Sequence, residues 1–135
     1  MKPIRIALTK GRLEKDTVAL FQLLGFDCSQ LLNKGRKLIL EIPDVNLEVV
    51  LAKAADVITY VECGVCDMGV VGKDTIMEYG GGFFEVLDLG FGRCRFALAT
   101  KKDSAFYGGY AVKTVATKYP NVTRNCFESK GMDVD

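Results

Sequence analysis

The sequence predicts an α/β fold built on a mainly parallel sheet. Short apolar stretches typical of strands alternate with stretches in which apolar residues recur at helical spacing. Glycines stand at several of the junctions, where a turn or a helix end is expected. Strands that alternate with helices in this way are typical of a parallel sheet. With 135 residues, the chain has the length of one domain, or of one domain and part of a second.

The first strand and helix are predicted from the first 25 residues. Residues 4–8 are expected to form a strand, and Gly11 supplies the turn after it. Apolar residues then recur at helical spacing from Leu13 to Leu24, and Gly25 ends the helix. Up to residue 79, the later elements are predicted as strands over 37–42 and 47–52, a short helix over 58–64, a brief strand at 68–71 and a helix over 73–79. The strand at 68–71 is nearly all apolar, so we expect it to be buried on both faces. The rest of the chain is predicted to form one or two strands within 83–103, a strand over 113–119 and a helix over 120–127.

The composition excludes several classes of function. A net charge of +1 lacks the basic excess of a duplex-DNA binder, and no stretch approaches the ~20 apolar residues of a membrane span. The N-terminus also lacks the continuous apolar core of a signal peptide. We therefore expect a cytoplasmic protein that binds neither nucleic acid nor a membrane. Because the chain contains no histidine, catalytic triads, zinc sites and bases that depend on imidazole are excluded.

The turn Thr9-Lys10-Gly11-Arg12 is the first candidate site. It follows the carboxyl end of a predicted strand and opens a predicted helix. In open α/β sheets ligands bind at such ends, and the free N–H groups of a helix N-terminus favour an anion. Arg12 adds a planar fork that matches phosphate oxygens, and Lys10 adds a point charge. A solvated basic turn explains the motif equally well, so the residues alone leave both readings open.

Two further segments are weaker candidates. Residues 69–74, Gly-Val-Val-Gly-Lys-Asp, again run from a strand through glycine and polar residues into a helix, although the spacing is not that of a phosphate loop. Packing alone explains such glycines, but two turns after neighbouring parallel strands would face one crevice. Arg36 follows Gly35 just before a predicted strand, where a solvated arginine is the plainer interpretation.

The cysteines are expected to be reduced and mostly buried. Five cysteines scattered over the chain do not suggest a disulfide framework. Cys63 and Cys66 form a C-x-x-C motif, but zinc would normally require a second pair. A redox pair should open a helix, whereas this one ends a helix and enters a strand. Burial of two small residues is therefore favoured over redox chemistry.

With these residues in place, the chain resembles the short-form catalytic subunit of the ATP phosphoribosyltransferases. The most specific stretch carries the Asp-x-x-Thr-Tyr-Val-Glu pattern followed by Gly-Val-x-Asp-x-Gly-Val-x-Gly-Lys-Asp. The matching segments cover nearly the whole chain in the order found in the family: IALTKGRLEKD, GRKLI, DVITYVECGVCDMGVVGKDTIME, EVLDLGFGRCRFALAT and VATKYPNVTRNCFESKGMDV. Cys63 and Cys66 stand where family members often have other residues, which argues further against a dithiol function.

The resemblance implies a fold, a reaction and partners. The fold is two-lobed and periplasmic-binding-protein-like, with residues 1–100 as the first α/β lobe and residues 101–135 as the incomplete start of the second. The reaction joins N1 of the adenine of ATP to C1 of phosphoribosyl pyrophosphate and releases pyrophosphate with Mg²⁺, as the first step of histidine biosynthesis. Short forms work with a histidyl-tRNA-synthetase-like regulatory subunit, so a homo- or hetero-oligomer is expected.

The resemblance also assigns roles to the candidate residues. Arg12 and Arg36 would be the catalytic cations of the substrate cleft. The expected substrate-binding residues are Lys10, Gly11, Gly69, Gly72, Lys73 and Asp74, and no residue is assigned as a metal ligand. Since N1 of adenine attacks with a lone pair and carries no proton, a protein without histidine can catalyse this step by positioning and fixed charge.

One part of the family pattern does not occur in these 135 residues. Family members carry a Thr-Gly-x-Thr-Leu signature that cradles the 5-phosphate and the ribose hydroxyls, and the chain has no match to it. We therefore expect the 135-residue chain to be weakly active or inactive by itself. Two alternatives stay open: a solute-binding module, which would normally carry an export signal, and a non-catalytic fragment or interaction protein that retains the first lobe.

Overall fold

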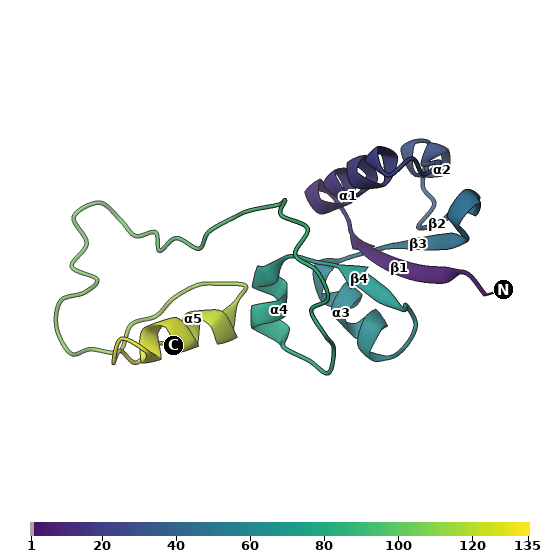
Figure 1. The fold of residues 1–135 in the computed structure, drawn as a ribbon. Coiled ribbons are helices and arrows are strands. Elements are labelled where there is room, and N and C mark those ends of the chain that lie inside the picture. The colour runs from purple at the N-terminus through teal and green to yellow at the C-terminus, as the bar shows by residue number, and fades with distance from the viewer. Residues whose placement is uncertain (1) are drawn as a thin grey trace. The chain divides into compact units, whose positions relative to one another are not determined.

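The computed structural model describes residues 2–135 and divides the chain into two compact units. The first unit extends to Gly92 and the second runs from Arg93 to Asp135. The helices and strands of both units are labelled in Figure 1. The predicted lobe boundary near residue 100 stays a prediction, because separate compact units do not establish the lobes of a longer family chain.

The first unit is built on a four-stranded sheet. Its strands are β1 (Ile4–Thr9), β2 (Ile39–Ile42), β3 (Leu47–Ala52) and β4 (Met68–Val70). They lie in the order β2-β3-β1-β4, with β1 parallel to both β3 and β4, and β2 antiparallel to β3. The predicted α/β class with a mainly parallel sheet is confirmed.

Helices cover both faces of this sheet. The helices of the first unit are α1 (Arg12–Leu23), α2 (Ser29–Leu32), α3 (Ala54–Glu62) and α4 (Lys73–Tyr79), with one 3-10 turn at Pro43–Val45. Figure 1 shows α1 and α2 on one side of the sheet and α3 on the other. Between residues 2 and 135, no helix has the length and apolar character needed to cross a membrane.

The alternation of side chains along β1 divides the core between the two faces. Ile6 and Leu8 pack with Phe21 of α1 in one buried cluster, whereas Ala7 packs with Val57 of α3 in the other. Successive residues of a strand point to opposite faces, so a single strand supplies both clusters. Burying a side chain of the size of Leu8 contributes about 1.5–3 kcal/mol to folding.

Three sequence predictions for the first unit are wrong in detail. The helix expected from Ile58 begins at Ala54, because the alanines after Lys53 favour helix over a longer strand. Helix α2 was not predicted, since its four residues are too few for a periodic pattern. Strand β4 is an edge strand of the described sheet, so Met68 is 47% exposed instead of buried on both faces.

The long segment after α4 also differs from the prediction. Residues 83–103 form no strand, and Phe84 and Val86 are almost fully exposed. Alternating apolar residues indicate a strand only when a neighbouring strand can pair with them, and no strand of the described residues pairs with this segment.

The second unit contains helix α5 (Pro120–Glu128), close to the predicted range 120–127. Phe127 is buried, and its ring lies 5.8 Å from the ring of Phe106 between centroids. The strand predicted over 113–119 is reduced to an isolated bridge between Lys113 and Val134. This bridge is too short for a sheet, so α5 and its aromatic contacts form the main regular structure of the unit.

Candidate functional site

The sheet topology brings four chain segments to one edge. The parallel strands β1, β3 and β4 all end there, with Thr9 paired to Ala52 and Leu8 paired to Val70. Because β2 is antiparallel to β3, its first residues lie at the same edge, where the backbone N–H of Leu51 donates to the carbonyl of Leu38 at 2.8 Å. We call this the carboxyl edge. In open α/β sheets it is the usual place for a ligand.

The turn after β1 is fastened to both neighbouring strands. The backbone N–H of Lys10 donates to the carbonyl of Ala52 at 3.0 Å, and the hydroxyl of Thr9 donates to the carbonyl of Val70 at 3.0 Å. Gly11 caps α1 with φ +101° and ψ −126°, a conformation that side chains rarely adopt. The glycine predicted as the turn residue is therefore required by the backbone itself.

The charges of this turn are accessible. Lys10 is exposed, and the Arg12 side chain is 72% exposed with its Nε 3.9 Å from the Asp16 carboxylate one helical turn further on. An exposed pair at this distance contributes about 0–1 kcal/mol, so it competes weakly with an anionic ligand. Both cations are available to a ligand at the carboxyl edge.

A buried carboxylate connects the Arg36 loop to this turn. Residues 33–38 form the loop before β2, in which the backbone N–H of Lys37 donates to the carbonyl of Lys34 at 3.0 Å. Lys34 forms an ion pair with the buried Glu14 of α1. Arg36, which the sequence singled out as a third cation, is exposed in this loop. The structure thus brings the Arg36 loop to the first turn of α1.

Gly69 within β4 and Gly72 after it are both close to other atoms of the protein. A Cβ atom on Gly69 would lie 2.6 Å from Cγ1 of Val57, so a glycine lets β4 approach α3. A Cβ on Gly72 would lie 2.2 Å from Oδ1 of Asp74, the oxygen that accepts the backbone N–H of Thr75 at 2.9 Å. Packing against Val57 therefore accounts for Gly69 whether or not a ligand lies nearby, whereas the atoms that a Cβ on Gly72 would meet belong to the Asp74 side chain alone.

Lys73 and Lys53 complete the cations of the candidate region. Lys73 opens α4 and forms an exposed ion pair with Glu85. Lys53 is exposed, caps α3 and directly follows Ala52, the residue that accepts the Lys10 N–H. Sequence reasoning missed Lys53, although the strand before it was predicted to end at Ala52. A lysine directly after the carboxyl end of a predicted strand was the signal that could have identified it.

Comparisons with known proteins agree with this architecture. A family model described as HisG: ATP phosphoribosyltransferase matches residues 53–135. The chain belongs to this family. An ATP phosphoribosyltransferase of Clostridium kluyveri is 58% identical over 134 residues, which are 99% of this chain and 61% of that protein. One of Clostridium novyi is 51% identical over 137 residues, covering 100% of this chain and 65% of that protein.

A solved structure extends the family likeness to the fold. The ATP phosphoribosyl transferase (HisG:HisZ) complex from Thermotoga maritima contains a chain that matches with a TM-score of 0.62 and 25% identity, over 98% of this chain and 61% of that one. The predicted periplasmic-binding-protein-like α/β class is confirmed. The chain spans about 61–65% of the length of these relatives. The family model begins at Lys53, so the Lys10–Arg12 turn and Arg36 are covered only by the pairwise matches.

The two thiols of the C-x-x-C motif differ in their exposure to solvent. Cys63 is exposed after α3, and Cys66 is buried before β4. Burial raises the pKa of the Cys66 thiol, and the neighbouring carboxylates of Asp67 and Glu48 raise it further against the opposing effect of Arg5. A raised pKa disfavours the reactive thiolate. The expectation that the cysteines are mostly buried is wrong for Cys63, Cys94 and Cys126, which are exposed.

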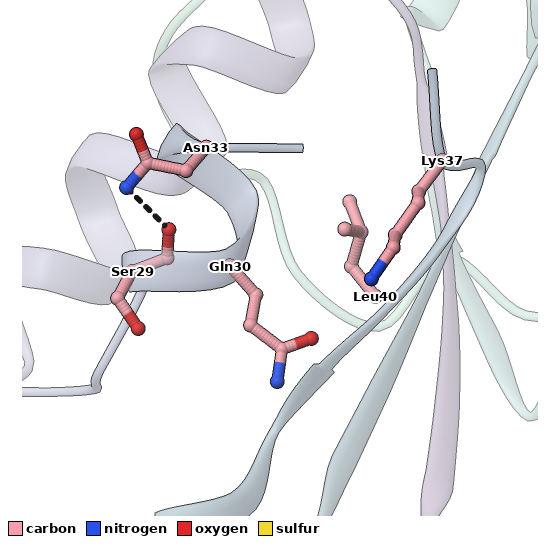
Figure 2. Close-up of a pocket in the computed structure, with 5 residues that line it drawn as sticks. All are labelled: Ser29, Gln30, Asn33, Lys37 and Leu40. Atoms are coloured by element: carbon pink, nitrogen blue, oxygen red, sulfur yellow. Dashed lines mark hydrogen bonds between the residues drawn. The ribbon is translucent and has the colours of Figure 1, made fainter. Parts of the chain in front are cut away.

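One cavity of about 280 Å³ lies between α2 and β2. It is lined by Ser29, Gln30, Asn33, Lys37 and Leu40, as Figure 2 shows. Gln30 has a structural role beside it, since its Oε1 accepts the backbone N–H of Glu41 on the edge strand at 3.2 Å. None of the predicted site residues lines this cavity. Over residues 2–135, no group of three or more His, Cys, Asp or Glu side chains is placed to hold a metal ion.

Proposed function

We propose that this chain is the N-terminal part of an ATP phosphoribosyltransferase that carries out the first step of histidine biosynthesis. In this reaction N1 of the adenine of ATP is joined to C1 of phosphoribosyl pyrophosphate. Family membership supports the activity. One observation on the chain itself supports the proposal most directly. The Lys10–Arg12 turn, Lys53 and the Arg36 loop all lie at the carboxyl edge of the sheet.

The bond changes suit a site made of fixed cations. The lone pair of N1 forms the new bond to C1, and the bond from C1 to the pyrophosphate oxygen breaks. Pyrophosphate leaves with that electron pair. N1 carries no proton, so no general base has to accept one. The main demand on the protein is to stabilise the negative charge that grows on pyrophosphate while the ribose becomes positive.

Arg12 and Arg36 are the side chains we assign to this charge. Both are exposed at the carboxyl edge, and a guanidinium can donate two parallel hydrogen bonds to phosphate oxygens. Lys10 and the backbone of Gly11 are assigned to phosphate binding. The segment from Gly69 to Asp74, including Gly72 and Lys73, is proposed to line the same crevice. Losing one preorganised donor in such a site typically costs about 10²–10³ in turnover.

Magnesium is proposed to enter with the substrate phosphates. Mg²⁺ is commonly held by one or two carboxylates together with substrate phosphates, and it neutralises charge on the leaving group when bound. No residue of this chain is assigned as its ligand. The role of Lys10, Arg12 and Arg36 is to bind and orient the phosphate oxygens that face the protein.

The partner is proposed from the solved relative. The Thermotoga maritima structure is a HisG:HisZ complex, so we expect the family-length protein to form a hetero-oligomer with a histidyl-tRNA-synthetase-like regulatory subunit. A cytoplasmic location belongs to the same proposal, because the substrates are intracellular metabolites.

The test compares this chain with a family-length chain that carries the same 135 residues. Both are assayed with ATP, phosphoribosyl pyrophosphate and Mg²⁺, with and without the regulatory subunit, by the absorbance of phosphoribosyl-ATP. We expect product from the longer chain and little from the 135-residue chain, since positioning of the ribose can supply ~7–11 kcal/mol of the barrier. Failure of the longer chain to form product under all conditions would refute the proposed activity. Rapid turnover by the 135-residue chain would show that the phosphoribosyl site is misplaced.

A further inference from the structure

Glu14 is a buried carboxylate that the proposed chemistry does not use. The residue is 8% exposed and lies in the first turn of α1. One of its oxygens, Oε2, accepts the backbone N–H of Gly11 at 3.3 Å. The other, Oε1, forms the ion pair with Lys34. A single side chain therefore contacts both the turn after β1 and the loop before β2, which is 20 residues away in sequence.

The two segments that Glu14 joins both carry cations. The turn carries Lys10 and Arg12, and the loop carries Lys34 and Arg36. Like charges that are held close together raise the free energy of the folded state unless a counter-charge lies among them. Glu14 supplies that counter-charge. Its side chain is 10% exposed, and both of its oxygens already have partners within the protein.

We propose that Glu14 is a positioning residue for the anion site. It holds the Lys10–Arg12 turn and the Arg36 loop at the separation that a pyrophosphate group requires, and it does not touch the ligand. This inference rests on the proposed function, because it assumes that both segments bind the same phosphates. It assigns to Glu14 and Lys34 a role that the sequence analysis did not anticipate.

When the charge of Glu14 is removed, the direction of the change in anion affinity distinguishes a positioning role from a simple electrostatic one. If the carboxylate only weakened a basic patch, its loss would make the carboxyl edge more positive, and an anion would bind more tightly. If it positions the two segments, its loss lets them move apart, and the anion binds more weakly. Glu14→Gln keeps the size of the side chain and an acceptor for Gly11, so it removes mainly the ion pair with Lys34.

The chain offers a closely matched control. Glu48 of β3 forms an ion pair with Arg5 of β1, and the exposed fractions of these side chains are 14% and 38%. The corresponding values for Glu14 and Lys34 are 10% and 35%. Arg5 lies four residues before the end of β1, which at about 3.3 Å per residue places it well away from the carboxyl edge. Glu48→Gln therefore removes an equally buried pair without disturbing the candidate site.

The experiment measures binding of inorganic pyrophosphate to the 135-residue chain by calorimetry. We expect Glu14→Gln to raise the dissociation constant at least about fivefold, the lower end of the coupling that is typical between two linked sites. Glu48→Gln should leave it unchanged. Hydrogen exchange followed by mass spectrometry should become faster in residues 10–13 and 33–38 of Glu14→Gln only. This second measurement reports on the contact between the segments and does not depend on the ligand.

Lys34→Met tests the ion pair between Glu14 and Lys34 by changing Lys34, the more exposed of the two partners. We expect weaker pyrophosphate binding, and the double variant with Glu14→Gln should bind no more weakly than either single variant, since both changes break one interaction. Equal or tighter binding by Glu14→Gln would overturn the inference, even if its exchange became faster. A wild-type chain that does not bind pyrophosphate would refute the anion site of the proposed function itself, and the inference with it.

Discussion

Lys10 donates its backbone N–H to the carbonyl of Ala52 at 3.0 Å, so the turn after β1 is attached to the end of β3. This bond continues the parallel pairing of the two strands by one residue beyond Thr9. It places Lys53, which follows Ala52, beside a turn more than 40 residues earlier in the chain. Cations that are distant in sequence therefore share one edge of the sheet.

Replacing Arg12 or Arg36 by alanine should reduce turnover of the family-length enzyme by about 10²–10³, because each change removes a guanidinium that we propose donates to the leaving group. Both side chains are exposed, so the free energy of unfolding should change by less than about 0.5 kcal/mol. Product absorbance and thermal unfolding measure the two effects. Lys15→Ala, which removes an exposed cation from the same helix as Arg12, is the control and should retain normal rates. Normal turnover in both arginine variants would remove them from the site.

Gly11→Ala should destabilise the fold by about 1–3 kcal/mol, because alanine is strained at φ +101°. A Cβ at this position would meet no atom within 4 Å, so the cost comes from the backbone and not from a clash. Gly82→Ala is the matched control, since its Cβ also meets nothing and its φ is not positive. Denaturant unfolding of both variants measures the difference. Equal stability of the two would mean that the turn relaxes freely.

Gly69→Ala should cost about 1–3 kcal/mol through overpacking, because its Cβ would lie 2.6 Å from Cγ1 of the buried Val57. The same substitution should cost less in a Val57→Ala background, where the closest clashing atom is absent and only Cγ2 of Val61 remains within 3.1 Å. A double-mutant cycle of unfolding free energies gives this coupling. Additive effects would contradict the close approach of β4 to α3.

Stability should fall at alkaline pH partly because of Cys66. Burial raises the pKa of this thiol in the folded state above its value in the unfolded chain. The contribution to stability is then complete below the unfolded pKa, about 8.5, and is lost as the pH rises through the folded pKa. Denaturant unfolding between pH 7 and pH 10 should show a steeper decline for the wild type than for Cys66→Ala. Parallel profiles would show that this thiol does not titrate differently in the two states.

Local sequence was sufficient for most elements of the first unit. The alternation at residues 4–8 and the helical spacing from Leu13 to Leu24 depend on near neighbours, and β1 and α1 form almost as predicted. The turn with Gly11 was also predictable, because glycine marks a backbone conformation that other residues avoid. The strands predicted after α4 do not form. Apolar and polar residues alternate within 83–103, but no strand of the described structure lies beside this segment.

The sequence by itself determined which residues form β1, β3, β4 and the first candidate turn, because periodicity and turn chemistry act over a few residues. Only the tertiary structure decided that Lys53 lies beside Lys10 and that Glu14 joins the Arg36 loop to α1. Those contacts depend on the order of the strands and on the direction of β2. Strand order is set by the packing of the whole sheet with its helices, so no local pattern of residues contains it.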